Sequence, residues 1–245
     1  MNLATLAEEV LVRWGEHPVL AFEGREWTNA DMQRAAARLA HGLVRLGLGP
    51  GDRAVVLLPN CPEVLQAYAA ILKLGGVIVP VVFLLNPEEV RHILADSGAR
   101  VVITAPEFLP KVEGWKGPVI LVGDGPGGRA WDAVVAGQPD RFPSVDRADD
   151  DITVLLYTSG TTGRPKGVAL SHANLAANAR AAASLYELTM RPEWAEDAIV
   201  SKLKRELVNQ YGIGRLESAL AELMADSEEH HIPRDIAERV KSHAV

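Results

Sequence analysis

Eleven consecutive residues, 157–167, combine the side chains and the backbone freedom that a phosphate-binding site needs. They contain three glycines, four serine or threonine hydroxyls and one lysine, and they directly follow the apolar run 152–156. Glycines let the backbone approach a ligand closely, and backbone N–H groups and hydroxyls donate hydrogen bonds to anionic oxygens. Lys166 adds a positive charge. We therefore expect a loop that binds phosphate groups after a buried strand, and we call residues 157–167 the phosphate loop.

The phosphate loop differs from two common nucleotide-binding patterns. The pattern G-x-x-x-x-G-K-[ST] does not fit, because Gly160 and Gly163 are too close together and Pro165 directly precedes Lys166. No G-x-G-x-x-G pattern follows an expected strand, since the glycine-rich residues 123–128 are typical of a surface loop. A flexible Gly/Ser/Thr linker is the remaining alternative, but it explains neither Pro165 and Lys166 nor the apolar flanks.

The segments before the phosphate loop predict alternating strands and helices. Short apolar runs indicate strands at residues 53–58, 77–82, 100–104, 119–122 and 152–156. A first-turn proline indicates a helix at residues 62–74, and an asparagine cap with a first-turn proline indicates one at residues 86–97. A further short helix is expected at residues 131–135. This alternation predicts an α/β fold with a largely parallel, doubly wound sheet and flanking helices. Ligands bind such sheets beyond the carboxyl ends of the strands, where the phosphate loop is expected.

The N-terminal residues precede this alternation. Apolar residues at helical spacing predict an amphipathic helix at residues 2–15, and residues 19–27 predict a short hairpin. Thr28 and Asp31 form the pattern of a capping box, which predicts a long helix that stops at Gly47. Residues 137–151 predict an irregular connection before the strand that carries the phosphate loop.

Composition excludes several classes of protein. The chain has 245 residues, is 48% apolar and carries a formal net charge of −7, as is usual for a soluble globular protein. An acidic balance argues against a general surface for nucleic acid or anionic membranes. Cys61 is the only cysteine, so no intramolecular disulfide forms, and we expect it to be a small buried side chain. Neither a signal peptide nor a transmembrane segment is predicted, and a cytoplasmic protein is the default expectation.

Residues 155–167 resemble the signature of the acyl-adenylate-forming superfamily, which includes acyl-CoA synthetases, peptide-synthetase adenylation domains and firefly luciferase. The resemblance continues through Leu175. Residues 55–63, 71–80 and 86–99 resemble, more narrowly, the fatty-acid–CoA ligase branch of the AMP-forming acyl-CoA synthetases. In order and spacing these segments agree with the phosphate loop, and the resemblance covers residues 1–186.

The resemblance implies a reaction. In this family a carboxylate attacks the α-phosphorus of Mg-ATP, pyrophosphate leaves, and the acyl group passes from the adenylate to the thiol of CoA. The implied ligands are therefore ATP, Mg²⁺ and a small-molecule carboxylic acid, with CoA as co-substrate. We expect a fatty acid, and aryl, short-chain and amino acids stay open. Lys166 would offset the charge of the departing pyrophosphate, and the hydroxyl of Thr158 is a weaker candidate for a Mg²⁺ contact. The residues implied to bind the β- and γ-phosphates are Thr158, Ser159, Gly160, Thr161, Thr162, Gly163 and Lys166.

Other residues near the phosphate loop have expected structural roles. Arg164 occupies the variable position of the signature and is expected to be exposed, while Pro165 fixes the turn. Tyr157 is expected to pack rather than react. His172 begins the next helix, where a capping or structural role and a ligand contact are both open.

The family pattern is not found after residue 186. The adenine-binding segment, the acidic Thr-Glu pair for Mg²⁺, the ribose aspartate, the hinge and the C-terminal lid with its catalytic lysine are absent from this sequence. Residues 187–245 instead predict a small α-helical segment of unknown origin, from a gene fusion, a deletion or frameshift, or a designed chimera. His230, His231 and His243 lack the H-E-x-x-H spacing of a zinc site.

The sequence therefore predicts a partial AMP-binding domain over residues 1–186 and a helical tail over residues 187–245. It predicts a truncated AMP-dependent acyl-CoA synthetase with little or no activity alone, because positioning by several groups at once supplies much of the rate. Two alternatives stay open: a non-catalytic ATP-binding or interaction module, and one part of a split enzyme. The uncovered strand edge of a partial sheet also predicts self-association or a protein partner.

Overall fold

A computed structural model describes residues 2–158 and 164–190, with the side chains of residues 183–190 excepted. Contacts divide the chain into two units, Met1–Ala176 and Ala177–Val245. The first unit contains the sheet and the helices that position the phosphate loop. In the second unit the described residues belong to helix α6 (His172–Met190), which begins in the first. The helical tail expected for residues 191–245 lies outside the described residues.

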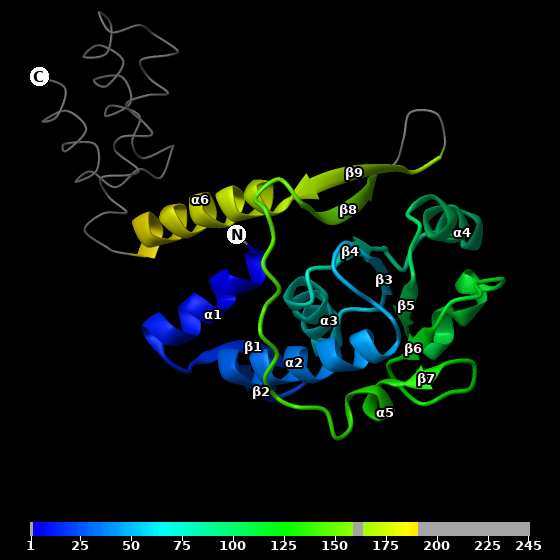
Figure 1. Ribbon diagram of the computed structural model, residues 1–245, viewed down its shortest axis with the longest axis horizontal. Helices are drawn as coiled ribbons and strands as arrows, with labels where there is room; N and C mark the ends of the chain where they lie inside the picture. Colours follow the sequence, from blue (N-terminus) through cyan, green and yellow to red (C-terminus); the bar gives the residue numbers. More distant parts are fainter. Residues whose placement is uncertain (1, 159–163, 191–245) are drawn as a thin grey trace, which may run out of the picture. The chain divides into compact units, whose positions relative to one another are not determined.

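The first unit is built on a seven-stranded sheet (Figure 1). Its strand order is β7-β6-β5-β3-β4-β8-β9, and every neighbouring pair is parallel except β8 and β9, which are antiparallel. The strands are β3 (Arg53–Leu57), β4 (Val77–Pro80), β5 (Val101–Thr104), β6 (Val119–Leu121), β7 (Arg129–Ala130), β8 (Ile152–Thr158) and β9 (Lys166–Ser171). The predicted α/β class with a largely parallel sheet is therefore correct.

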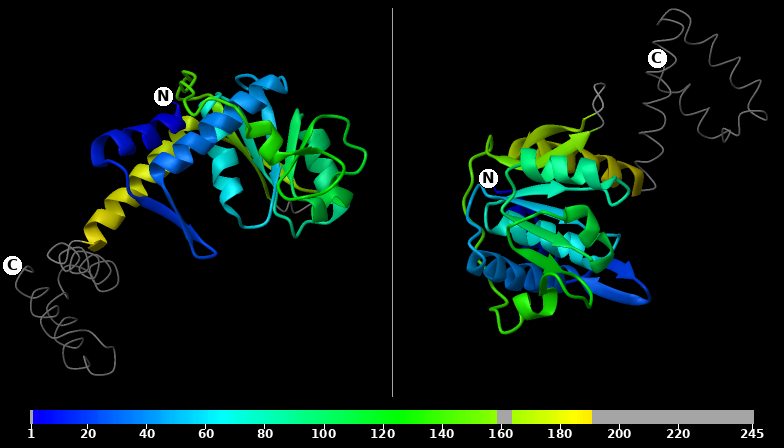
Figure 2. Two further views of the ribbon diagram at one scale, coloured as in Figure 1. Left: turned by 90° about the horizontal axis from the view of Figure 1, so that it is seen from below. Right: turned by 90° about the vertical axis from the view of Figure 1, so that its right-hand side faces the viewer.

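Helices cover both faces of this sheet, as the apolar strands predicted (Figure 2). One core cluster joins the sheet to α2 (Asn29–Arg45), α3 (Pro62–Lys73) and α5 (Trp131–Val135). The cluster on the opposite face joins it to α4 (Pro87–Asp96) and the 3₁₀ helix η1 (Pro106–Val112). Successive strand residues alternate between the two clusters: Val56 belongs to the first, and Val55 and Leu57 to the second. The central strands are therefore buried on both faces.

The helices begin where the sequence predicts. The Thr28–Asp31 capping box is formed at α2, and Asn86 with Glu89 forms a second one at α4. These reciprocal bonds satisfy N–H groups that the first helical turn leaves without partners. Gly42 in α2 allows a close approach to α5, since a Cβ there would lie 2.5 Å from Val134 Cγ1.

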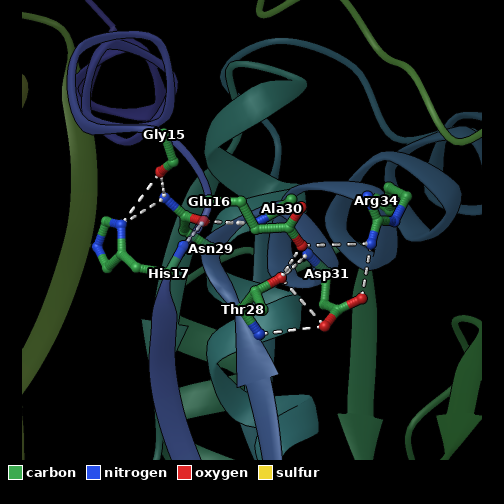
Figure 3. Close-up of polar contacts among 8 residues, drawn as sticks. All are labelled: Gly15, Glu16, His17, Thr28, Asn29, Ala30, Asp31 and Arg34. Atoms are coloured by element: carbon green, nitrogen blue, oxygen red, sulfur yellow. Dashed lines mark hydrogen bonds and ion pairs between the residues drawn. The ribbon is translucent and has the colours of Figure 1, made fainter.

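The predicted hairpin and first helix are also present. β1 (Pro18–Phe22) pairs antiparallel with β2 (Arg25–Thr28), and α1 spans Leu3–Trp14. Asn29 links these elements, because its amide nitrogen donates to the Gly15 carbonyl at 2.9 Å and its amide oxygen accepts from His17 N at 3.1 Å (Figure 3). The join between helix, hairpin and α2 is therefore held by one buried side chain.

A polar network joins α1 and its N-cap Asn2 to the end of α3, which leads into β4, and to residues 144–145 of the connection that leads into β8. The Asn2 amide donates to the carbonyls of Leu72 and Val145, at 2.7 and 2.8 Å. Lys73, whose side chain is 6% exposed, forms an ion pair with Glu8, which also accepts a 2.7 Å hydrogen bond from Ser144. Most of these contacts join residues that are far apart in sequence, and none of the contacts was predicted.

Three elements were not predicted: η1, β7 and β9. Pro106 and Pro110 obscure a helical pattern in η1, and β7 has only two residues. Most of β9 is exposed, so it lacks the alternation of apolar residues that predicts a strand. The irregular connection over residues 137–151 and the helix start at His172 agree with prediction.

Candidate phosphate-binding site

The phosphate loop begins and ends at the carboxyl edge of the sheet. β8 runs parallel to β4 and finishes at Thr158, and the chain returns antiparallel through β9 from Lys166. Thr158 and Lys166 are register partners, so two of the predicted phosphate-binding residues lie directly opposite each other. The other five, Ser159, Gly160, Thr161, Thr162 and Gly163, lie outside the described residues.

Thr158 and Lys166 are both exposed. Within residues 2–158 and 164–190, no hydrogen bond or ion pair engages the Lys166 ammonium or the Thr158 hydroxyl. A cation and a hydroxyl at the end of a strand pair suit an anionic oxygen cluster, because an ammonium and a hydroxyl both donate hydrogen bonds to it. The described part of the loop therefore fits a phosphate group.

Tyr157 packs beneath the loop. Its ring belongs to the core cluster on the α4 face, and its hydroxyl donates a 2.6 Å hydrogen bond to Asp96 Oδ2. Burial, reinforced by the Asp96 carboxylate, raises the pKa of the Tyr157 hydroxyl well above its usual value. This phenol stays protonated at neutral pH, in agreement with the expected packing role.

Pro165 carries a contact that the sequence did not predict. Its carbonyl accepts a 3.1 Å hydrogen bond from His92 Nε2, a residue of α4. Arg164, next to it, is exposed as expected. His92 and Asp96 were missed because 73 and 61 positions separate them from their partners. Their four-residue spacing on one helix was the available signal, but nothing in the sequence connects that helix with the loop.

A mostly apolar hollow of about 260 Å³ opens beside the carboxyl ends of β3, β4 and β8. Asn60 and Tyr68 supply polar groups to its lining. Its apolar lining includes Val56, Leu58, Val81, Phe83 and Leu156. The hollow and the phosphate loop lie at the same edge of the sheet, and Tyr157 takes part in both.

Two other residues considered from sequence lie outside this site. Cys61 precedes α3 and is half-buried against the core; burial, with Glu63 nearby, raises the pKa of its thiol to about 11. It is therefore a packed thiol rather than an activated nucleophile. His172 lies at the amino end of β8 and is 1% exposed, and its Nδ1 accepts a 3.0 Å hydrogen bond from Leu3 N. Its role is structural.

Metal binding is not visible in the described residues. They contain no group of three or more His, Cys, Asp or Glu side chains that could hold a metal ion. The Thr158 contact to Mg²⁺ stays a prediction, and His230, His231 and His243 lie outside the described residues. No helix in the described part of the chain is long and apolar enough to cross a membrane.

The profile of the family described as AMP-binding enzyme matches residues 7–205. This match covers most of the chain, and it includes the strand pair and the phosphate loop between Thr158 and Lys166. The chain belongs to the AMP-binding enzyme family. The resemblance inferred from the phosphate loop is thereby confirmed.

Individual relatives agree with the family. Feruloyl-CoA synthase of an Amycolatopsis species is 42% identical over 159 residues, which cover 63% of this chain and 30% of that protein. Fatty acid–[acyl-carrier-protein] ligase ScoC of Streptomyces coeruleorubidus is 39% identical over 158 residues, with the same two coverages. By name, one relative is a synthase of an acyl-CoA and the other is a ligase of fatty acids. The chain spans about a third of the length of the curated relatives it matches.

A solved structure shows the same fold. ATP-bound MatB from Rhodopseudomonas palustris superposes with a TM-score of 0.63 and 31% identity, covering 72% of this chain and 36% of that one. This similarity of sequence and fold agrees with the family assignment.

The family match extends beyond residue 186, where the sequence resemblance was expected to stop, and reaches residue 205. The division by contacts falls between residues 176 and 177. The boundary at residue 186, the separate helical tail and its origin stay predictions.

Proposed function

We propose that this chain supplies the phosphate-binding part of an AMP-forming acid–CoA ligase. In the complete reaction a carboxylic acid is adenylated by ATP and its acyl group is transferred to CoA. The observation that carries the proposal is the pairing of Thr158 with Lys166 at the carboxyl edge of a sheet in a member of the AMP-binding enzyme family.

The roles of the residues follow from charge. A carboxylate that approaches ATP meets like charge, and negative charge grows on pyrophosphate as it leaves. Preorganised donors and a cation reduce both penalties, and one such donor contributes about 3 kcal/mol to the transition state. We assign Lys166 to the β- and γ-phosphates, together with Thr158, Ser159, Gly160, Thr161, Thr162 and Gly163. Thr158 is also the proposed contact of the accompanying Mg²⁺.

The acid substrate is proposed at two levels. A small-molecule carboxylic acid fits the family, and a fatty acid is our specific proposal from the sequence resemblance. The similarity to ScoC supports a fatty acid, and the similarity to a feruloyl-CoA synthase supports an aromatic acid as the competing substrate. A panel with both classes of acid, used with the complete enzyme, distinguishes them.

Activity of the 245-residue polypeptide alone is a separate proposal. We expect it to bind Mg-ATP or pyrophosphate but to catalyse little or no ATP–pyrophosphate exchange, because the nucleoside pocket and the lid lysine were not found in its sequence. Calorimetry measures the binding of Mg-ATP or pyrophosphate, and the exchange assay measures catalysis. Each is carried out with a panel of fatty and aromatic acids. Absence of binding would contradict the phosphate site, and robust exchange would contradict the expected inactivity. We place the protein in the cytoplasm, as the sequence suggested.

A second candidate is that this polypeptide is one part of a split enzyme. The exposed apolar side chains of Leu156 and Val168, 42% and 44% exposed, favour it, because they are cross-strand neighbours on one face of β8 and β9. A complementary chain or a second copy would cover them. Sedimentation velocity with the purified chain tests self-association: a monomer at micromolar concentration would contradict pairing with a second copy.

A further inference from the structure

Helix α4 makes hydrogen bonds to both ends of the phosphate loop. Asp96 accepts from the hydroxyl of Tyr157, the first residue of the loop, and His92 donates to the Pro165 carbonyl just before β9. His92 and Asp96 are four residues apart, so they project from the same face of the helix. One helix therefore contacts the end of β8 through Tyr157 and the residue that precedes β9 through Pro165.

We propose that α4 positions the phosphate-binding groups, with His92 and Asp96 as positioning residues that keep Thr158 and Lys166 opposite each other. Neither residue is proposed to touch the ligand. That the positioned groups bind phosphate rests on the proposed function. That α4 orders the backbone of β8 and β9 does not depend on it.

The His92 contact fixes the backbone next to Lys166. A proline carbonyl can only accept a hydrogen bond, so His92 carries a proton on Nε2. The carbonyl carbon of Pro165 belongs to the peptide plane that contains the backbone nitrogen of Lys166. Holding that carbonyl limits the orientation of the peptide unit from which the Lys166 side chain extends.

The Asp96 contact fixes both strands through one aromatic ring. Tyr157 and Gly167 are cross-strand partners, and a Cβ on Gly167 would lie 3.1 Å from Tyr157 Cζ. The tyrosine ring therefore lies across Gly167 and uses the space that a side chain would fill. Asp96 holds the far end of this ring through a 2.6 Å hydrogen bond, which a charged acceptor strengthens.

Helix α4 is itself firmly placed. The Asn86–Glu89 capping box fixes its start, and Val90 and Ile93 are fully buried in the core cluster on that face of the sheet. The face that carries His92 and Asp96 therefore has little freedom to move away from the loop. Positioning by a preorganised scaffold lowers the ordering cost of binding.

The test measures two properties of the full 245-residue chain. Hydrogen–deuterium exchange reports the backbone protection of residues 152–158 and 166–171, and isothermal titration calorimetry reports affinity for pyrophosphate. The variants are His92→Ala, Asp96→Ala and Tyr157→Phe. Conservative replacements are His92→Gln, which places an amide donor near the position of Nε2, and Asp96→Asn, which keeps an acceptor.

A matched control exists in α2. His41 also bonds a backbone carbonyl through Nε2, that of Arg141 at 2.9 Å, but it lies away from the loop. His41→Ala removes the same type of hydrogen bond and should change neither exchange in residues 152–171 nor pyrophosphate affinity.

We expect His92→Ala, Asp96→Ala and Tyr157→Phe to speed exchange in both segments and to weaken pyrophosphate binding about fivefold, as the loss of one hydrogen bond implies. His92→Gln and Asp96→Asn should restore most of both properties. Unchanged exchange in the alanine variants, or equal effects of His92→Gln and His92→Ala, would overturn the proposal. If the unmodified chain binds no pyrophosphate, the proposed function fails, and the exchange measurements still decide the role of α4.

Discussion

The two edges of β4 and β8 are built differently. At the amino edge, buried polar side chains bond to the backbone or to a charged partner: Asn2 and His172, each 1% exposed, bond to backbone groups, and Lys73, whose side chain is 6% exposed, pairs with Glu8. At the carboxyl edge, Thr158 and Lys166 are exposed, and within the described residues no hydrogen bond or ion pair engages the Thr158 hydroxyl or the Lys166 ammonium. Polar side chains are buried at the first edge and exposed at the second, where we propose that they bind a ligand.

Because of this difference, we expect substitutions at the amino edge to change mainly stability and substitutions at the carboxyl edge to change mainly ligand binding. Buried polar groups need partners, so the network at the amino edge is costly to disturb and should contribute strongly to folding. Groups at the carboxyl edge satisfy themselves with water or with a ligand, so their removal should affect binding more than folding.

Replacing Glu8 by Ala should destabilise the chain by about 2–3 kcal/mol, between the values for exposed and buried ion pairs. The change leaves the buried Lys73 ammonium without its anionic partner and removes the acceptor of Ser144. Urea denaturation measures the free energy of unfolding. The double variant Glu8→Ala/Lys73→Met should recover most of the loss, because it removes the unpaired charge; no recovery would mean that lost packing, not charge, dominates.

Lowering the pH should weaken the amino edge through His172. Burial, with Arg147 nearby, lowers the pKa of His172 below 6.5, while Asp149 and Asp151 act in the opposite direction. The unfolded state therefore takes up a proton first, and stability falls as the pH drops from about 6.5 to the folded-state pKa. Protonated Nδ1 can no longer accept from Leu3 N. Denaturation curves between pH 8 and 5 check this, and His172→Gln should flatten the dependence by comparison with the unmodified chain.

Replacing Asn86 by Ala should cost about 1 kcal/mol of stability, the usual value of an N-cap. Thr28→Ala, which removes the other capping box, is the matched control and should cost about as much. The two should differ in binding, because α4 contacts the phosphate loop and α2 does not. Calorimetry with pyrophosphate distinguishes them, and equal affinities would weaken the role assigned to α4.

Replacing Val168 by Thr should change stability by no more than about 0.5 kcal/mol, because its side chain is 44% exposed in β9. The same substitution at Val55, which is 0% exposed in β3, should cost about 1–3 kcal/mol by burying a hydroxyl. If exposed β8 and β9 mediate self-association, Val168→Thr should also reduce it in sedimentation velocity. A large loss of stability from Val168→Thr would show that this edge is part of the core.

Local patterns predicted most of the fold. The capping boxes at Thr28 and Asn86, the turn between β1 and β2, and the short apolar strands each depend on neighbouring residues, so the sequence alone reveals them. The position of the phosphate loop at the carboxyl edge follows from a parallel sheet.

The contacts that support the site could not be predicted in this way. His92 to Pro165, Tyr157 to Asp96, and Asn2 to Val145 all join segments separated by more than 60 residues. They depend on how the helices pack on the sheet, and no local pattern encodes that packing. The ion pair between Lys73 and Glu8 could not be predicted for the same reason, because the apolar sequence around Lys73 gives no sign of an acidic partner in α1.

The most direct test of this separation is the substitution Lys166→Ala, with pyrophosphate or Mg-ATP binding measured by calorimetry and stability measured by urea denaturation. Loss of a charged hydrogen bond to phosphate predicts at least about tenfold weaker binding with stability unchanged to within about 0.5 kcal/mol. Unchanged affinity in Lys166→Ala, or a marked loss of stability, would contradict the assignment of Lys166 to phosphate binding at the carboxyl edge.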